Sequence, residues 1–173
     1  MLDIQSYKTV WTMGHKIRKA LGDRDAHYQL AGLIEMDDTY VGAPKPGKRG
    51  RGATGKAKVV VAVETPADKP RFATMQVVSR VSAAEIQTLV QERLAAEAVV
   101  RTDGWQGYSV LDQPPRHHEW LVPASGPEAV RLLPWVHTLI ANVKGNIRGI
   151  HHGMSQKHLP RYLAQFCYRF NRH

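Results

Sequence analysis

Three short runs of strand-forming residues follow one another in the first half of the chain and constrain its fold more than any other feature. They read LAGLIEMDDTYVG, VVVAVE and RFATMQVVS. Runs of this length that are rich in apolar and β-branched residues are typical of strands. Because no helical pattern lies between them, we expect the three strands to pair as an antiparallel meander.

A helix and a fourth strand are predicted next. Residues 82–97 have an apolar face at helical spacing, with Ser82 as the N-cap and Glu85 as its capping-box partner. The run AVVRTD then predicts a short buried strand. A helical crossover allows this strand to lie parallel beside the first one. The expected fold class is therefore α/β, with a mixed β-sheet flanked by helices.

The remaining segments predict three more helices and one more strand. Residues 8–21 form the first helix, and the run HHEWLV forms the strand. Residues 134–148, which begin at Pro134, and residues 155–173 form the two closing helices. The apolar face of the first helix carries Val10, Met13, Ile17 and Leu21.

The charge of the chain indicates a polyanionic partner. Its 24 Lys and Arg residues outnumber its 15 Asp and Glu residues, which gives a net charge of +9, and nucleic acid is the commonest partner of such a protein. No run of 18 apolar residues occurs, so we expect no membrane contact. The single cysteine, Cys167, excludes an internal disulfide and a thiolate zinc cluster, and a reducing cytoplasm is the expected location.

Two acids stand at the ends of strands that the crossover would make neighbours. We expect Asp37 at the end of the first strand and Asp103 at the end of the fourth. Strand alternation places Asp37 on the same face as Glu35 and turns Asp38 to the other face. Paired carboxylates suit Mg²⁺ or Mn²⁺, and two such ions about 3.5–4 Å apart assist phosphoryl transfer. The sequence therefore predicts a site for two divalent metal ions.

These motifs together resemble a known family. The segments IEMDDTYVG, GKRGRGATGK, RTDGWQGY and the tail from His137 to Arg172 are similar to bacterial insertion-sequence transposases of the DDE type, in their ISXO-like branch. The resemblance runs from about Lys8 to the C-terminus and implies an RNase H-like catalytic domain. It implies that Asp37 and Asp103 are the first two catalytic acids, and that the activity is cutting and joining DNA.

The third catalytic residue is open between two candidates. Many related enzymes carry Glu at this position and a basic residue seven places later on the same helix. Lys144 matches the basic residue, and His137 stands seven places before it, on the same helical face. Parts of the family have Asn instead, which would map to Asn142. A third alternative is that neither His137 nor Asn142 is the catalytic ligand. The nearest acid upstream of them is then Glu128.

A basic track is predicted to contact the DNA backbone. Glycines between its cations would let the loop that precedes the second strand approach phosphates closely. A solvated loop without such contacts is the alternative. The predicted DNA-binding residues are Lys48, Arg49, Arg51, Lys56 and Arg148.

The expected organisation is an N-terminal helical segment over residues 1–25 and an RNase H-like transposase catalytic domain over residues 26–173. Fuller family members also carry an N-terminal zinc ribbon, whose paired cysteines this chain lacks. The expected partners are element ends and target DNA, and the family implies a homodimer on DNA. The alternatives are a catalytically impaired or truncated DNA-binding remnant and a nuclease that hydrolyses without joining.

Overall fold

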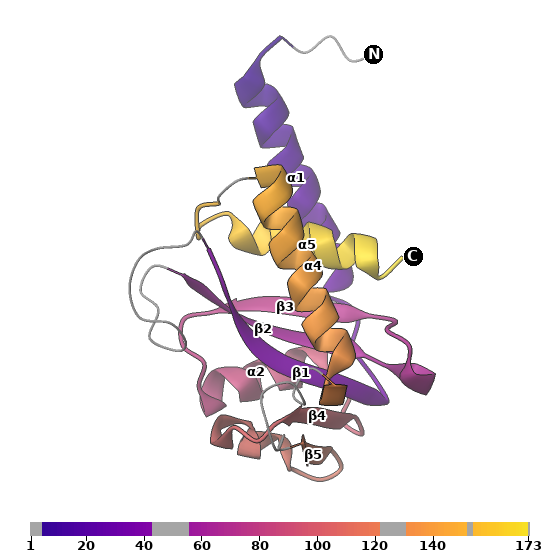
Figure 1. The fold of residues 1–173 in the computed structure, drawn as a ribbon. Coiled ribbons are helices and arrows are strands. Elements are labelled where there is room, and N and C mark those ends of the chain that lie inside the picture. The colour runs from indigo at the N-terminus through magenta and orange to yellow at the C-terminus, as the bar shows by residue number, and fades with distance from the viewer. Residues whose placement is uncertain (1–4, 43–55, 122–130, 152–153, 173) are drawn as a thin grey trace.

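A five-stranded mixed sheet forms the centre of the computed structural model (Figure 1), which describes residues 5–42, 56–121, 131–151 and 154–172. The strands lie in the order β3-β2-β1-β4-β5. The pairs β1–β2 and β2–β3 are antiparallel, whereas β1–β4 and β4–β5 are parallel. The predicted meander and crossover are therefore confirmed. The strands are β1 (Leu33–Val41), β2 (Ala57–Glu64), β3 (Ala73–Val78), β4 (Val99–Asp103) and β5 (His117–Leu121).

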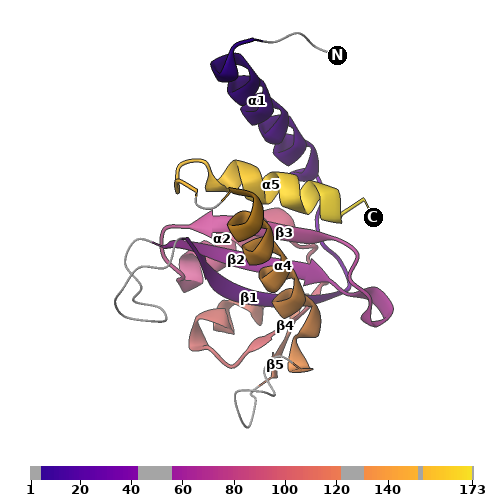
Figure 2. The ribbon, with the colours of Figure 1, turned by 45° about the horizontal axis from the view of Figure 1, so that its top comes forward.

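Helices cover both faces of this sheet. Figures 1 and 2 show α4 and α5 on one face, with α4 running across the strands, and α2 on the opposite face. The short 3-10 helix η2 packs beside α2. The helices are α1 (Tyr7–Asp25), α2 (Ala83–Arg93), α4 (Pro134–His151) and α5 (Leu159–Phe170), with the 3-10 turns η1 (Pro66–Asp68) and η2 (Gln106–Leu111). None of the helices in the described ranges is long and apolar enough to cross a membrane.

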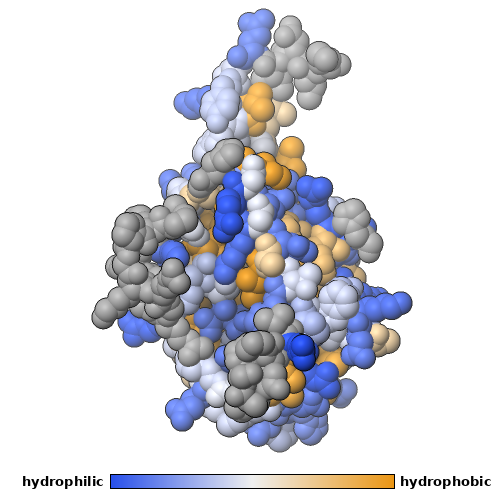
Figure 3. Space-filling view, viewed as in Figure 1, coloured by the Kyte–Doolittle hydropathy of each residue, from blue (hydrophilic) through white to orange (hydrophobic). Residues whose placement is uncertain are grey.

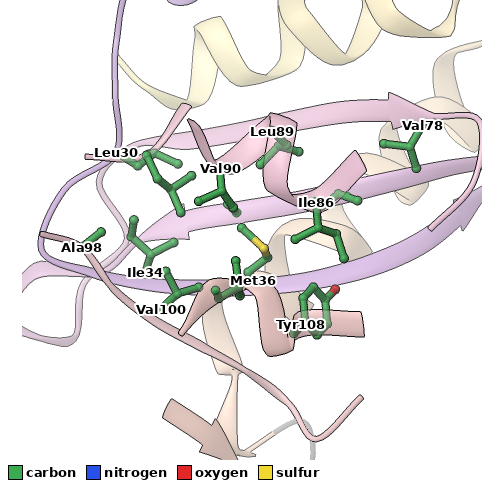
Figure 4. Packing of buried hydrophobic residues seen from close by; sticks show 14 residues of the cluster. Leu30, Ile34, Met36, Val78, Ile86, Leu89, Val90, Ala98, Val100 and Tyr108 are labelled. Carbon is green, nitrogen blue, oxygen red and sulfur yellow. The ribbon is translucent and has the colours of Figure 1, made fainter. Parts of the chain in front are cut away.

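Alternation along the strands divides the core into two layers. Even-numbered residues of β1, Ile34 and Met36, point to Ile86 and Leu89 of α2 and to Tyr108 (Figure 4). Odd-numbered residues of β2 point the other way, to α4 and α5. The buried positions of α4 recur at helical spacing and are Val136, Leu139, Ile140 and Val143. One face of β1 is therefore committed to α2 and the other to α4.

The helix α1 exposes the face that its apolar pattern would bury. It extends beyond the sheet, and Figure 3 shows apolar surface along it. Its buried residues are instead His15, whose ring lies 4.7 Å from that of His158, and Asp25. The helix contacts α5 through this polar and aromatic side because Tyr162 of α5, and His158 just before α5, lie against His15 there. The exposed apolar and aromatic residues of α1, which are 40% to 81% exposed, are Tyr7, Val10, Trp11, Met13 and Ile17.

The N-terminus of α2 is capped in part as predicted. The Ser82 hydroxyl accepts a hydrogen bond from the backbone N–H of Glu85, at 3.4 Å. The Glu85 carboxylate does not complete a capping box, because it accepts instead from the backbone N–H groups of Ser79 and Arg80. It therefore fixes the turn between β3 and α2.

The C-terminal end of α5 is fastened to the edge strand β3 by one side chain. The Asn171 amide accepts from the backbone N–H of Ala73, at 2.7 Å, and donates to the carbonyl of Ala73, at 3.2 Å. It also donates to the buried carboxylate of Asp25, at 3.0 Å, which Arg172 neutralises at 2.9 Å. Asn171 therefore joins α5, β3 and the end of α1.

Candidate active site

Asp37 and Asp103 lie on the same face of two neighbouring parallel strands. The register pairs Ile34 with Val100 and Glu35 with Arg101, and Asp37 and Asp103 each lie two residues further along. This face is the one covered by α4, as strand alternation predicts. The fold thus places the two predicted acids on one sheet face, with Asp37 beneath the N-terminal half of α4. Asp37 lies in the middle of β1, not at its end as predicted, because the strand continues to Val41.

The Asp37 carboxylate meets α4 directly. One oxygen accepts a hydrogen bond from the backbone N–H of Asp38 at 2.7 Å, and the other lies 3.6 Å from Nδ1 of His137. The side chains of Asp37 and His137 are 16% and 26% exposed. The Asp103 carboxylate accepts from the backbone N–H of Trp105, at 3.3 Å, which orients it at the strand end. All of these carboxylates and the imidazole remain open to solvent in part.

His137 and Lys144 share the side of α4 that faces Asp37. Burial lowers the pKa of Lys144, nearby Lys56 and Arg148 lower it further, and Asp37 opposes them by raising it. Lys144 therefore interacts electrostatically with Asp37 and with the two other cations. Asn142 lies elsewhere, exposed on the side of α4 that faces α5. The choice between His137 and Asn142 as a catalytic ligand stays a prediction.

A buried carboxylate that the sequence reading did not single out supports this helix. Glu35 is 5% exposed, and its Oε2 atom accepts hydrogen bonds from the backbone N–H groups of Trp135, at 2.8 Å, and Val136, at 2.9 Å. Burial raises the pKa of Glu35, whereas these two hydrogen bonds and Arg101 lower it. A signal for this contact exists in the sequence, because Leu133, which precedes Pro134, has no side-chain oxygen to cap the helix.

The motif TDGWQGY builds the floor beside Asp103. Trp105 packs edge-on against buried Tyr108, with ring centroids 5.3 Å apart, and both belong to the core layer under α2. The indole of Trp105 lies over Gly107 so closely that a Cβ atom there would collide with the ring. A glycine is thus required at position 107 for this close approach, and Trp105 acts as packing.

A groove of about 700 Å³ runs between α4, α5 and α1. Its walls include Asn142 of α4 and Tyr162 of α5. The guanidinium of Arg18 lies 4.2 Å above the Tyr162 ring and donates to the Gln165 side chain at 2.8 Å. Asn142 therefore belongs to this groove.

The predicted basic track is described only at its ends. Lys56 is half-buried just before β2, and Arg148 is exposed on α4; both lie near Lys144. Lys48, Arg49 and Arg51, and also Glu128, lie outside the described residues. Their part in DNA binding or catalysis therefore stays a prediction.

The donor chemistry at this site suits a hard divalent cation only in part. Asp37 and Asp103 supply oxygen ligands of the type that Mg²⁺ and Mn²⁺ prefer, and His137 supplies an imidazole nitrogen beside Asp37. Among the residues described, however, no three carboxylate, imidazole or thiol groups come together closely enough to hold a metal ion. Asp37 and Asp103 thus share a sheet face, and His137 adjoins Asp37, but the three do not form a complete metal-binding group.

Comparison with solved structures finds similar folds in a viral intasome and in a mariner transposase. A chain of the simian T-cell lymphotropic virus intasome, in complex with PP2A regulatory subunit B56 gamma, is 11% identical, with a TM-score of 0.55. The similarity covers 83% of this chain and 49% of that one, so this chain spans about half the length of its neighbour. This likeness shows that the mixed sheet and its helices form an RNase H-like fold.

Two structures of the Mos1 mariner transposase are also similar. Its catalytic domain is 12% identical, with a TM-score of 0.47, over 99% of this chain and 91% of that one. Its paired-end complex with Mn is 13% identical, with a TM-score of 0.43, over 99% of this chain and 61% of that one. No curated protein matches the chain.

The sequence itself matches a family over most of its length. The family described as the ISXO2-like transposase domain matches residues 29–171, from just before β1 to the Asn171 clamp. The match includes Asp37 and Asp103, the whole of α4 and the DGWQGY floor. The chain therefore belongs to the ISXO2-like transposase domain family.

Proposed function

We propose that this domain cuts and joins DNA phosphodiester bonds with the help of two divalent metal ions, Mg²⁺ or Mn²⁺. The observation that carries the proposal is the contact between β1 and α4. There the Asp37 carboxylate lies 3.6 Å from His137, within reach of Lys144, on the sheet face that also bears Asp103. Carboxylates on neighbouring parallel strands, with cations beside one of them, suit chemistry on a polyanionic backbone.

Asp37 and Asp103 are the residues that would hold the metal ions, with His137 as a third ligand. When bound, such ions lower the pKa of an attacking hydroxyl and offset charge on the leaving oxygen. Two carboxylates and an imidazole give the ions one negative charge fewer than three carboxylates do. We therefore expect Mn²⁺ to support the reaction better than Mg²⁺, because Mn²⁺ accepts nitrogen ligands more readily.

Lys144 has a separate role in this proposal. Its ammonium group is half-buried beside Asp37, so its charge is less screened than that of a surface lysine. It would contact a non-bridging phosphate oxygen and hold the scissile strand against the acids. Lys56 and Arg148, which lie near it, would contact flanking phosphates.

The proposed partners are element ends and target DNA, bound by a homodimer in the cytoplasm. The net charge of +9 supports a DNA partner, because much of the affinity for DNA arises from counterion release. The alternative remains a DNA-binding remnant of a transposase that no longer cuts. The two differ in one result, namely whether bound DNA is cleaved when a metal ion is supplied.

The test is a cleavage and strand-joining assay on DNA that carries the inverted repeats flanking the gene, with Mn²⁺ or Mg²⁺. Replacing Asp37 or Asp103 by Asn should lower the rate by about two to three orders of magnitude while DNA binding persists. Asp23→Asn, on the exposed side of α1, is the matched control and should leave the rate unchanged. Wild-type protein that binds without cutting would instead identify a remnant, and hydrolysis without joining would identify a nuclease.

A further inference from the structure

The helix that carries His137 and Lys144 begins without a capping residue of its own. Its first residue, Pro134, has no backbone N–H, and the preceding Leu133 has no side-chain acceptor. The next two backbone N–H groups, of Trp135 and Val136, donate to the Glu35 carboxylate of β1. The cap of α4 is therefore supplied from a strand that lies about 100 residues earlier in the chain.

The geometry of this cap restricts how α4 can move. Both N–H groups converge on a single oxygen, Oε2, at 2.8 and 2.9 Å. Sliding the helix by one residue would displace it by about 1.5 Å and turn it by about 100°, which would break both hydrogen bonds. His137 follows Val136 directly, and Asp37 follows Glu35 by two residues on the same strand face. Few covalent bonds therefore separate the cap from the contact between Asp37 and His137.

Burial makes this attachment strong. Glu35 is 5% exposed where β1 meets the first turn of α4. The positive end of the helix dipole favours its negative charge, and Arg101, its register partner on β4, favours it further. Removing the side chain would leave the buried N–H of Val136 and the partly buried N–H of Trp135 without this acceptor, so the helix start would have to shift to reach another one.

We propose that Glu35 is a positioning residue, which holds α4 in the register and rotation that set His137 and Lys144 against Asp37. The proposal rests on the proposed function for its link to catalysis. It assigns no contact between Glu35 and substrate, because the two hydrogen bonds to α4 occupy its buried end. Its effect on the reaction passes through the position of α4.

Three substitutions separate this role from others. Glu35→Gln keeps an oxygen that can accept both hydrogen bonds, although it removes the charge. Glu35→Asp keeps the charge but shortens the side chain by one methylene, so it cannot reach the helix from the same backbone position. Glu35→Ala removes the acceptor. The matched control is Glu64→Ala, because Glu64 is similarly buried in β2 but accepts from the backbone N–H of Ala31 and pairs with Arg71.

The first measurement is amide hydrogen exchange by NMR on the complete protein without DNA. Glu35→Ala and Glu35→Asp should speed exchange at Trp135 and Val136 more than at later residues of α4, whereas Glu35→Gln should keep both amides protected. Glu64→Ala should leave the relative protection of these two amides unchanged. Unchanged protection in Glu35→Ala and Glu35→Asp would overturn the proposal, whatever the activity of the protein.

The second measurement is the split between kcat and KM in the strand-cleavage assay. Glu35→Ala and Glu35→Asp should lower kcat by about a hundredfold, because a misplacement of about 1 Å has that effect, with KM for DNA little changed. Glu35→Gln should recover most of the rate. If Glu35→Asp is fully active while Glu35→Gln is not, charge is what matters, and the positioning role is wrong. Failure of the wild type to cut DNA defeats the proposed function, whereas the exchange experiment still decides whether Glu35 holds α4.

Discussion

Nδ1 of His137 lies 3.6 Å from a carboxylate oxygen of Asp37, and this contact joins the first strand of the sheet to the helix that crosses it. Asn142, five residues later on the same helix, lines the groove between α4 and α5. The two candidate ligands therefore occupy different sides of α4. They can be separated by substitutions that leave the fold of the helix intact.

We predict that His137→Ala weakens Mn²⁺ binding and strand cleavage, whereas Asn142→Ala changes neither. The reason is that only His137 adjoins Asp37, so only its removal takes a nitrogen ligand from the site. His137→Glu should raise the affinity for Mg²⁺, because it restores an anionic oxygen ligand. Isothermal titration with each metal ion checks these outcomes. The assignment passes to Asn142 if its variant loses metal affinity and the His137 variant does not.

Lys144→Ala should weaken DNA binding and reduce the slope of log affinity against log salt by about one, the value for one lost phosphate contact. Burial lowers the pKa of Lys144 from the ordinary lysine value of 10.5, so its ammonium loses its proton earlier as the pH rises. The affinity of the wild-type protein for DNA should therefore begin to fall, on raising the pH, before the pH reaches 10.5. Fluorescence anisotropy at several salt concentrations measures both effects. Lys19→Ala serves as the control, since Lys19 is exposed on α1 and pairs with Asp23; an equal drop in its slope would contradict a specific contact at Lys144.

Much of the site follows from periodicity, and that part was accessible from the sequence. Alternation along β1 puts Asp37 on the face opposite Asp38, and the seven-residue spacing of His137 and Lys144 puts both on one side of α4. The crossover through α2 brings β4 beside β1 because parallel strands need a long connection. Each of these inferences depends only on the spacing of residues within one element or on a single crossover connection.

The parts that the sequence did not reveal are pairings between distant elements. Nothing in the residues around Glu35 shows that its partner is the start of α4. The absence of a capping side chain at Leu133 indicates only that α4 needs an acceptor from elsewhere. The apolar pattern of α1 likewise favours the wrong face, because α5 offers an aromatic and histidine surface that accepts His15. The apolar pattern of a helix shows which of its faces is the most hydrophobic. It carries no information about the chemistry of the surface against which the helix packs.

Asn171→Ala should destabilise the domain by about 2–4 kcal/mol. It removes three hydrogen bonds and leaves the buried Asp25 carboxylate and the edge of β3 with fewer partners. Chemical denaturation followed by circular dichroism gives the free energy of unfolding. Asn142→Ala is the control, because alanine at that exposed helix position should change stability by at most about 0.7 kcal/mol. A similar small change for Asn171 would show that the C-terminal clamp contributes little.

Stability should fall as the pH drops below 6.5, in part because of His15. Burial lowers the pKa of His15 from 6.5, and His158, Arg18 and Arg161 lower it further. Below 6.5 the unfolded chain therefore binds a proton that the folded protein resists, so acid favours unfolding and the full stability is present only above that value. Urea denaturation at pH 8 and at pH 5.5 measures the difference. His15→Phe should make the difference smaller, and an unchanged difference would assign the pH dependence to other groups.

The cap that Glu35 places on α4 has a consequence for how the protein is made. Glu35 and the start of α4 are separated by about 100 residues, which a ribosome adds in roughly 5–20 s. During that interval the acid of β1 has been synthesised, but the helix that would complete its surroundings has not. Asn171, which fastens α5 to β3, follows α4 in the chain and is added later still. A nascent chain of this transposase domain therefore acquires the contact between Asp37 and His137 only after α4 has been synthesised, although β1 is made much earlier.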